Sequence, residues 1–147
     1  MAGAGKSSIG RKLANYLKFD LIDSDQLIET NQNKSLQEVL VENGIQKFKK
    51  IEEAAILSVE FNQTVLATGG SAIFSKKAMN HIKSNSSVIY LEVSFKDIMD
   101  RIPDFSNRGF IKEADQTMEN AFNERETIYR DFADHIAVSY THLRAHE

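Results

Sequence analysis

Residues 3–8 of this chain read Gly-Ala-Gly-Lys-Ser-Ser, and an apolar stripe at helical spacing follows at once. Gly5, Lys6 and Ser7 match the last three fixed positions of the phosphate-binding loop G-x-x-x-x-G-K-S/T. Small residues let backbone N–H groups close around a phosphate, while the lysine reaches its oxygens and the hydroxyl ligates Mg²⁺. The stretch therefore predicts a nucleotide-binding domain that transfers phosphoryl groups. Taken alone, it also fits a Gly-rich tail before an ordinary helix.

The residues before Lys6 supply only part of such a loop. Its first fixed glycine would stand one position before Met1, and no β-strand precedes the loop in this sequence. We therefore expect a chain that is truncated at its N-terminus.

The composition is that of a soluble globular domain. Of 147 residues, 41% are hydrophobic and 27% charged, the formal net charge is −3, and there is no cysteine. The acidic balance gives no support for nucleic acid as a partner. No apolar run approaches the ~20 residues of a membrane span, and no signal peptide precedes the loop. These features favour one cytoplasmic domain that acts on a small molecule, without a nucleic-acid or membrane partner.

Helical and strand-like patterns alternate along the chain. Helices are expected at about 6–18, 25–30, 35–44, 48–62, 76–85, 94–102 and 115–133, and strands at about 19–23, 64–68, 87–91 and 134–137. Capping boxes begin at Ser35 and Ser94, and a polar loop is expected from Pro103 to about Glu113. Strands that alternate with helices indicate βαβ units and therefore a parallel sheet in an α/β fold.

Several motifs stand in an order and at a spacing that resemble the shikimate kinase family. They are residues 3–14, 23–25 with 28–29, Phe48 with 51–52, 67–70, 88–91, Arg108, and 124–125 with Tyr129. The resemblance covers residues 3 to about 136. It implies a kinase that moves the γ-phosphoryl group of ATP to a hydroxyl of shikimate, in aromatic amino acid biosynthesis, and that is a monomer when complete.

The fold implied by this resemblance is a three-layer α/β/α P-loop kinase with a parallel sheet. The central first strand of that sheet is missing from this chain. In the family fold it lies between the strands expected here at 64–68 and 87–91. We therefore expect a gap between those two strands.

The resemblance also assigns the nucleotide site. The residues that it implies for ATP binding are Gly3, Ala4, Gly5, Lys6, Ser7, Ser8 and Arg108. Ser7 would ligate Mg²⁺, and Asp23 would stand near the ion without binding it directly. Arg108 would close over the phosphates and stabilise charge in the transition state.

For the acceptor, the resemblance implies a second group of residues. Asp25 would accept hydrogen bonds from shikimate hydroxyls and could act as the base, so that the catalytic set is Lys6, Asp25 and Arg108. The remaining substrate-binding residues would be Lys49, Gly69, Gly70 and Arg125. Out of this context the two aspartates fit helix N-caps, the glycines a plain turn, and Arg125 a surface ion pair.

Four positions depart from the family pattern. Lys49 and Ser71 replace an arginine and a glycine, whereas Gly109 and Ile45 replace a proline and a glutamate. A lysine cannot give the planar two-point grip of an arginine on a carboxylate. The departures keep two alternatives open, a gluconate-kinase-like enzyme and an inactive nucleotide-binding module.

Residues 138–147 do not resemble the end of the family sequence. They correspond to one reading frame of a transposon-based sequencing adapter, and we expect a kinase-like domain at 1–137 followed by a non-native tail. His142 and His146 are for that reason not interpreted as a metal site.

Overall fold

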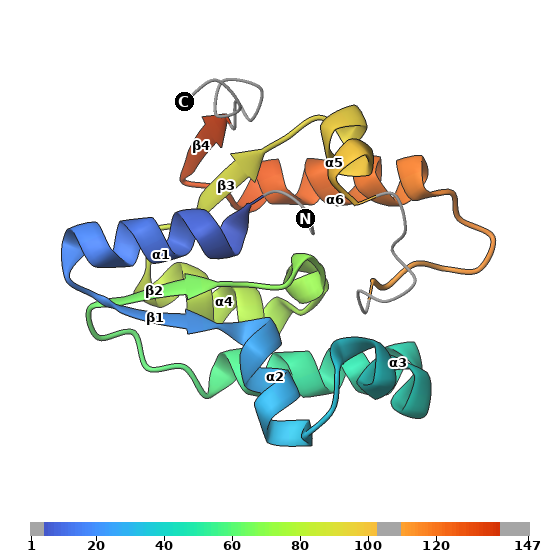
Figure 1. Ribbon diagram of the computed structural model, residues 1–147, viewed down its shortest axis with the longest axis horizontal. Helices are drawn as coiled ribbons and strands as arrows, with labels where there is room; N and C mark the ends of the chain where they lie inside the picture. The colour runs from blue at the N-terminus through green and yellow to red at the C-terminus, as the bar shows by residue number, and fades with distance from the viewer. Residues whose placement is uncertain (1–4, 103–109, 139–147) are drawn as a thin grey trace.

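The computed structural model describes residues 5–102 and 110–138, and it alternates helices with short strands (Figure 1). The elements are α1 (Lys6–Leu17), β1 (Asp20–Asp23), α2 (Ser24–Gln32), α3 (Leu36–Leu57), β2 (Thr64–Ala67), the 3-10 helix η1 (Gly70–Phe74), α4 (Lys76–Asn85), β3 (Ile89–Glu92), α5 (Phe95–Arg101), α6 (Met118–Phe132) and β4 (His135–Val138). The mixed α/β class expected from the sequence is confirmed.

All strand pairs among the described residues are parallel, but they form two sheets. β1 pairs with β2 from Asp20↔Thr64 to Asp23↔Ala67, and β3 pairs with β4 from Ile89↔His135 to Glu92↔Val138. The single continuous sheet that alternation favours is therefore not formed by these strands. The break lies between β2 and β3, where the gap was expected.

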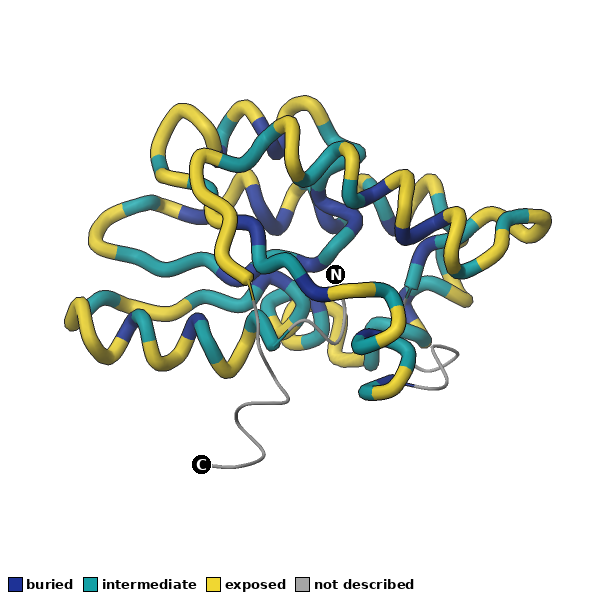
Figure 2. The backbone as a smooth tube through the Cα atoms, turned by 90° about the horizontal axis from the view of Figure 1, so that it is seen from above, coloured by how far each residue is buried: buried dark blue, intermediate teal, exposed yellow. Residues whose placement is uncertain are grey.

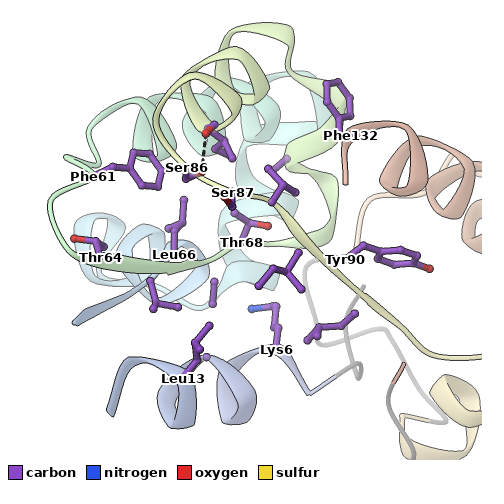
Figure 3. Close-up of a pocket in the computed structure, with 18 of the residues that line it drawn as sticks. Lys6, Leu13, Phe61, Thr64, Leu66, Thr68, Ser86, Ser87, Tyr90 and Phe132 are labelled. Carbon is purple, nitrogen blue, oxygen red and sulfur yellow. Dashed lines mark hydrogen bonds between the residues drawn. The ribbon is translucent and has the colours of Figure 1, made fainter. Parts of the chain in front are cut away.

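A large cavity occupies this break between β2 and β3 (Figure 3). Its volume is about 550 Å³, and its walls include Val65, Leu66 and Ala67 of β2, Tyr90 and Leu91 of β3, and Leu13 of α1. The walls are mainly apolar. Lys6, at the start of α1, also lines the cavity, so the break reaches the beginning of the phosphate-binding loop's helix.

The β1–β2 pair lies between helices on both of its faces. A methyl group placed on Gly10 of α1 would contact the side chains of Leu21, Val65 and Ala67. Leu66, which points to the other face, packs with Met79 and Ile82 of α4. This alternation of strand side chains gives the α/β/α layering that the resemblance implies.

Among the described residues, buried apolar side chains form three clusters. Figure 2 shows how buried and exposed positions alternate along the backbone. One cluster joins α2 to α3 through Ile28, Val39 and Phe48, which are at most 2% exposed. The others centre on α4 and on α5 with α6. Full burial of each such side chain stabilises the fold by about 1.5–3 kcal/mol. The cluster on α4 also forms part of the cavity wall, through residues such as Met79 and Ile82, whereas the buried residues of the other two clusters lie outside that wall.

The expected capping boxes and helix limits are mostly present. The hydroxyl of Ser35 accepts from the Glu38 amide at 3.2 Å, and that of Ser94 accepts from the Asp97 amide at 3.1 Å. The two helices expected at 35–44 and 48–62 are both present within α3, on either side of Gly44, whose φ of 78° and ψ of 168° are not helical; the second ends at Leu57, before the expected residue 62. A positive φ favours glycine, so the chain can kink there between the two helices.

The boundary expected after residue 137 falls inside a strand. Val138 is the last residue of β4 and pairs with Glu92. The expected tail at 138–147 stays a prediction, and residues 139–147 lie outside the described part of the chain. Among the described helices none has the length and apolar character that crossing a membrane requires.

Candidate active site

The phosphate-loop helix begins as its sequence predicts. Gly5 precedes α1 with φ 88° and ψ 18°, a left-handed conformation that favours glycine. Since glycine has no side chain to cap the helix, the first-turn N–H groups at Lys6 and Ser7 are presented to an anion. Gly3 and Ala4, the two earlier residues assigned to ATP binding, lie outside the described residues.

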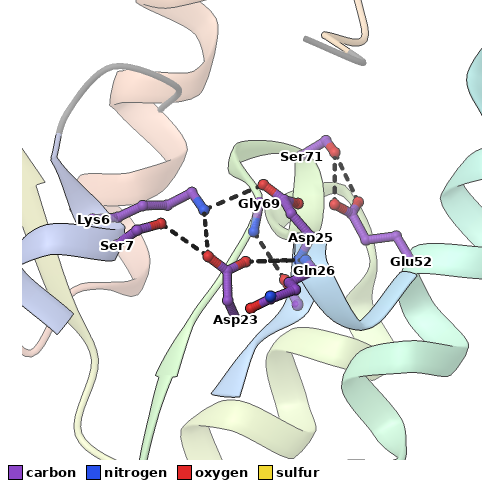
Figure 4. Close-up of polar contacts among 9 residues, drawn as sticks. Lys6, Ser7, Asp23, Asp25, Gln26, Glu52, Gly69 and Ser71 are labelled. Atoms are coloured by element: carbon purple, nitrogen blue, oxygen red, sulfur yellow. Dashed lines mark hydrogen bonds and ion pairs between the residues drawn. The ribbon is translucent and has the colours of Figure 1, made fainter. Parts of the chain in front are cut away.

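Lys6 and Ser7 meet the two aspartates that follow β1 (Figure 4). The Lys6 ammonium lies 3.2 Å from Asp25 Oδ2 and 3.7 Å from Asp23 Oδ2, and the Ser7 hydroxyl donates to Asp23 Oδ2 at 2.9 Å. The carboxylate of Asp23 also accepts from the amides of Asp25 at 2.9 Å and Gln26 at 3.3 Å. Asp23 is thus an N-cap and a partner of the loop at once, whereas Asp25 extends toward Lys6.

Gly69 is required by close approach rather than by its backbone angles. Its φ is −64°, but an added Cβ would lie 2.4 Å from Asp25 Oδ1 and 2.8 Å from Glu52 Oε2. The Gly69 amide donates to the Ser24 hydroxyl at 3.0 Å, and Ser24 is fully buried. This contact locks the start of α2 to the turn after β2. Sequence reasoning missed it, because no local pattern joins residues 45 positions apart.

Glu52 is a buried carboxylate beside this turn. The Ser71 hydroxyl donates to Glu52 Oε1 at 2.7 Å and reaches Oε2 at 3.0 Å, with the two residues 7% and 3% exposed. Burial raises the pKa of Glu52 to about 7, and the negative charge of Asp25 adds to this, while the Ser71 hydrogen bond and the cations Arg125 and Lys49 oppose it. Glu52 therefore titrates near neutral pH.

Arg125 is buried against aromatic rings and is not a surface ion pair. It is 3% exposed, its guanidinium donates to the Ile111 carbonyl, and it lies 4.0 Å from the ring centre of Phe110 and 5.6 Å from that of Phe74. The Lys49 ammonium lies 5.0 Å from the same Phe74 ring. The two cations assigned to the substrate carboxylate therefore both lie near one aromatic ring.

These side chains line a small cavity at the carboxyl ends of β1 and β2. It is bounded by Lys6 of α1, Asp25 of α2, Glu52 of α3, the 69–71 turn and Arg125 of α6. The cavity volume is about 40 Å³, enough for about one or two waters. A larger acceptor therefore requires these side chains to separate. Gly70 lies in the same wall, and its carbonyl accepts from the Tyr129 hydroxyl at 2.7 Å.

The structure thus gathers most of the predicted site residues and leaves two regions undescribed. Lys6, Asp25, Gly69, Gly70 and Arg125 line the cavity, and Lys49 approaches it through Phe74. Ser8 continues the first turn of α1. Arg108, assigned to ATP and to catalysis, lies outside the described residues, as does Gly109.

The sequence of the chain matches the model of one known protein family. The family sequence model described as shikimate kinase matches residues 2–145. The chain belongs to the shikimate kinase family. Its matched range runs into the segment 138–147 and lends no support to a foreign origin of that segment. Family membership gives the activity, which is that of a shikimate kinase in the shikimate pathway.

Individual shikimate kinases resemble the chain over most of its length. Shikimate kinase 2 of Photorhabdus laumondii is 32% identical over 139 residues, covering 91% of this chain and 80% of the relative. The shikimate kinase of Francisella tularensis subsp. novicida is 35% identical over 136 residues, with 90% and 77% covered. The match favours shikimate over the gluconate-type acceptor left open by the sequence.

Solved shikimate kinases have the same fold. The enzyme of Acinetobacter baumannii in complex with shikimate superposes with a TM-score of 0.84 at 27% identity, covering 94% of this chain and 79% of the solved chain. That of Aquifex aeolicus gives 0.77 at 25% identity, with 94% and 82% covered. The described α/β arrangement is therefore that of the family.

Proposed function

We propose that the side chains around the small cavity carry out the MgATP-dependent phosphorylation of a shikimate hydroxyl. The carrying observation is the ion pair of Lys6 with Asp25 at 3.2 Å, at the point where the phosphate-loop helix meets the buried cations. In this reaction a bond forms between the hydroxyl oxygen and the γ-phosphorus, the bond from that phosphorus to the β–γ bridging oxygen breaks, and ADP leaves.

On the nucleotide side, residues 3–8 bind the phosphates. The Ser7 hydroxyl and Asp23 carboxylate are oxygen donors 2.9 Å apart, a fit for Mg²⁺, which prefers such ligands together with phosphate oxygens and water. Ser7 would bind the ion and Asp23 would support it. When bound, Mg²⁺ neutralises charge on the phosphate oxygens. Arg108 is proposed to add a further positive charge there.

On the acceptor side, Asp25 is proposed to receive the proton of the attacking hydroxyl. In the structure, Lys6 forms an ion pair with this carboxylate. When ATP binds, the Lys6 ammonium can leave Asp25 and bind the phosphate oxygens instead, so that the Asp25 carboxylate can accept the hydroxyl proton. The same lysine thereby couples the arrival of the nucleotide to the activation of the acceptor.

The carboxylate of the acceptor is proposed to bind to Arg125 and Lys49. Arg125 offers a planar fork of donors and is already oriented by Phe110 and the Ile111 carbonyl. Lys49, whose ammonium lies 5.0 Å from the centre of the Phe74 ring, adds a point charge. The backbone at Gly69 and Gly70 completes the wall of the pocket.

The direct test is product formation with matched acceptors. Residues 1–147 are incubated with MgATP and either shikimate or gluconate, and the phosphorylated product is followed by ³¹P NMR. Phosphorylation of shikimate alone supports the proposal. A gluconate product, or no product with either acceptor from both residues 1–147 and the same chain with an apolar strand joined in front of Met1, would overturn the assignment of this cavity.

A further strand is also proposed to complete the sheet between β2 and β3. Each of these strands pairs on one side only with another described strand, and the cavity of about 550 Å³ between them has apolar walls. Central parallel strands are apolar on both faces. Because Lys6 lines the same cavity, a strand there would lead directly into the phosphate loop. Without it, we propose that the chain is a poor catalyst, since its loop lacks support.

Two remaining proposals rest on the family resemblance alone. The complete protein would act as a monomer, and it would act in the cytoplasm.

A further inference from the structure

Ser71 holds a buried acidic side chain that faces the candidate acceptor pocket (Figure 4). Its hydroxyl lies 2.7 Å from one carboxylate oxygen of Glu52 and 3.0 Å from the other. Both residues are buried, and both line the small cavity. Because Ser71 lies on η1 and Glu52 on α3, the contact ties these two walls together.

Glu52 stands among charged groups from three helices. Its Oε2 and Asp25 Oδ1 border the same point beside Gly69, where an added methyl group would touch both. Arg125 of α6 and Lys49 of α3 act on its charge from the other directions, and Glu52 in turn acts on Tyr129 of α6. The orientation of the Glu52 carboxylate therefore affects both Asp25, the proposed base, and the two cations Arg125 and Lys49.

We propose that Ser71 is a positioning residue of the acceptor pocket, whose hydroxyl fixes the orientation of the Glu52 carboxylate beside Asp25 and favours its ionised form. The inference rests on the proposed function for the position of the acceptor. Ser71 acts through Glu52 and does not touch the reacting atoms.

The physical reason is competition for the Asp25 carboxylate. An ionised Glu52 only accepts hydrogen bonds, and Ser71 provides one. A protonated Glu52 can instead donate to the neighbouring Asp25, and this would occupy the oxygen that the acceptor hydroxyl needs. Because the Ser71 hydrogen bond lowers the pKa of Glu52 against the effect of burial, its loss raises that pKa further.

The change to make is Ser71→Ala, with Ser75→Ala as the matched control. The Ser75 hydroxyl likewise donates to a glutamate of α3, Glu53, but neither residue lines the small cavity. Ser71→Thr keeps the hydroxyl and should rescue. Glu52→Gln removes the titrating group and should remove the associated pH dependence.

Kinetics provide the first readout. In the parent, kcat/KM for shikimate should rise with pH as Glu52 ionises near pH 7. Ser71→Ala should move this rise to higher pH by about half a pH unit to one, and lower kcat/KM at pH 7 by about twofold to sixfold. The deficit should disappear at high pH, and the KM for ATP should not change. Superimposable profiles of parent and variant would overturn the proposal.

The titration of Glu52 itself provides a readout that needs no turnover. With ¹³C-labelled glutamate, the Glu52 carboxyl resonance is followed against pH in the parent, Ser71→Ala and Ser75→Ala. The midpoint should rise in Ser71→Ala alone, and an unmoved midpoint would refute the link between the two residues. If shikimate is phosphorylated neither by the parent nor by the parent with an apolar strand joined in front of Met1, while the midpoint moves, the proposed function fails and the Ser71–Glu52 link stands.

Discussion

The ammonium of Lys6 lies 3.2 Å from the carboxylate of Asp25 and thereby joins the phosphate-loop helix to the helix that follows β1. Neither side chain is fully buried, at 21% and 27% exposed, so each is accessible to a ligand. The pair therefore joins the proposed nucleotide site, at Lys6, to the proposed acceptor site, at Asp25.

Lys6→Ala should abolish phosphoryl transfer to shikimate. Removing a charge that acts on the transferring phosphoryl group costs about 2.7–4 kcal/mol of transition-state stabilisation, or about 100–1,000-fold in kcat, by analogy with other electrostatic donors. A coupled assay of ADP release measures the loss. Lys12→Ala, on an exposed position of the same helix, is the control and should keep parental turnover. Turnover of Lys6→Ala within about threefold of the parent would refute the phosphate-loop assignment.

Asp23→Asn should raise the Mg²⁺ concentration needed for half-maximal activity. Asparagine caps helices about as well as aspartate, so α2 should keep its start and the melting temperature should change little. The charge beside Ser7 is lost, however, and with it the support proposed for the ion. A magnesium titration at saturating ATP makes the measurement, with Asp20→Asn, exposed at the start of β1, as control. An unchanged magnesium requirement would remove Asp23 from the metal site.

Lys49→Arg should lower the KM for shikimate. An arginine offers two parallel donors to a carboxylate, whereas Lys49 offers a point charge 5.0 Å from the Phe74 ring. Steady-state kinetics at several shikimate concentrations make the test, and Lys50→Arg, on the exposed side of α3, controls for the substitution itself. A KM that stays the same or rises would indicate a pocket already arranged around the lysine.

The parts of this molecule that the sequence predicts are those encoded by neighbouring residues. The loop before α1, the caps at Ser35 and Ser94, and the alternation of strands with helices depend on contacts within a few positions. The resemblance to shikimate kinases then supplies the site residues, because it indicates which helix N-termini and turns come together in one site.

The parts that could not be predicted depend on packing between distant segments. Helical periodicity alone could not show that Arg125 is buried between Phe74 and Phe110 and not paired on the surface. Ser71 was recognised only as a departure from a glycine, since its bond to Glu52 spans 19 positions. The second helix of α3 ends at Leu57, before the expected residue 62, and β4 runs one residue beyond the expected 137, where Val138 pairs with Glu92.

An apolar strand joined in front of Met1 should stabilise this chain and increase its activity. The proposed site is the cavity between β2 and β3, where Val65 and Leu91 belong to the apolar walls. Each Val or Ile that such a strand buries contributes about 1.5–3 kcal/mol, and its backbone would pair with two strand edges. Since domains are stable by only about 5–15 kcal/mol, residues 1–147 alone should melt below about 45 °C.

The experiment compares three proteins by thermal melting and by shikimate turnover. They are residues 1–147, the same chain with a seven-residue Val/Ile-rich extension and a short glycine link, and a version of that extension with proline at its centre. Proline cannot donate a ladder hydrogen bond and is excluded from central strands. The apolar extension should raise the melting temperature by at least about 5 °C and increase kcat/KM, while the proline version should do neither. Equal gains from both extensions would mean that the added residues do not form a strand in the cavity. A cooperative melt of residues 1–147 above about 45 °C would mean that the sheet does not need an added strand.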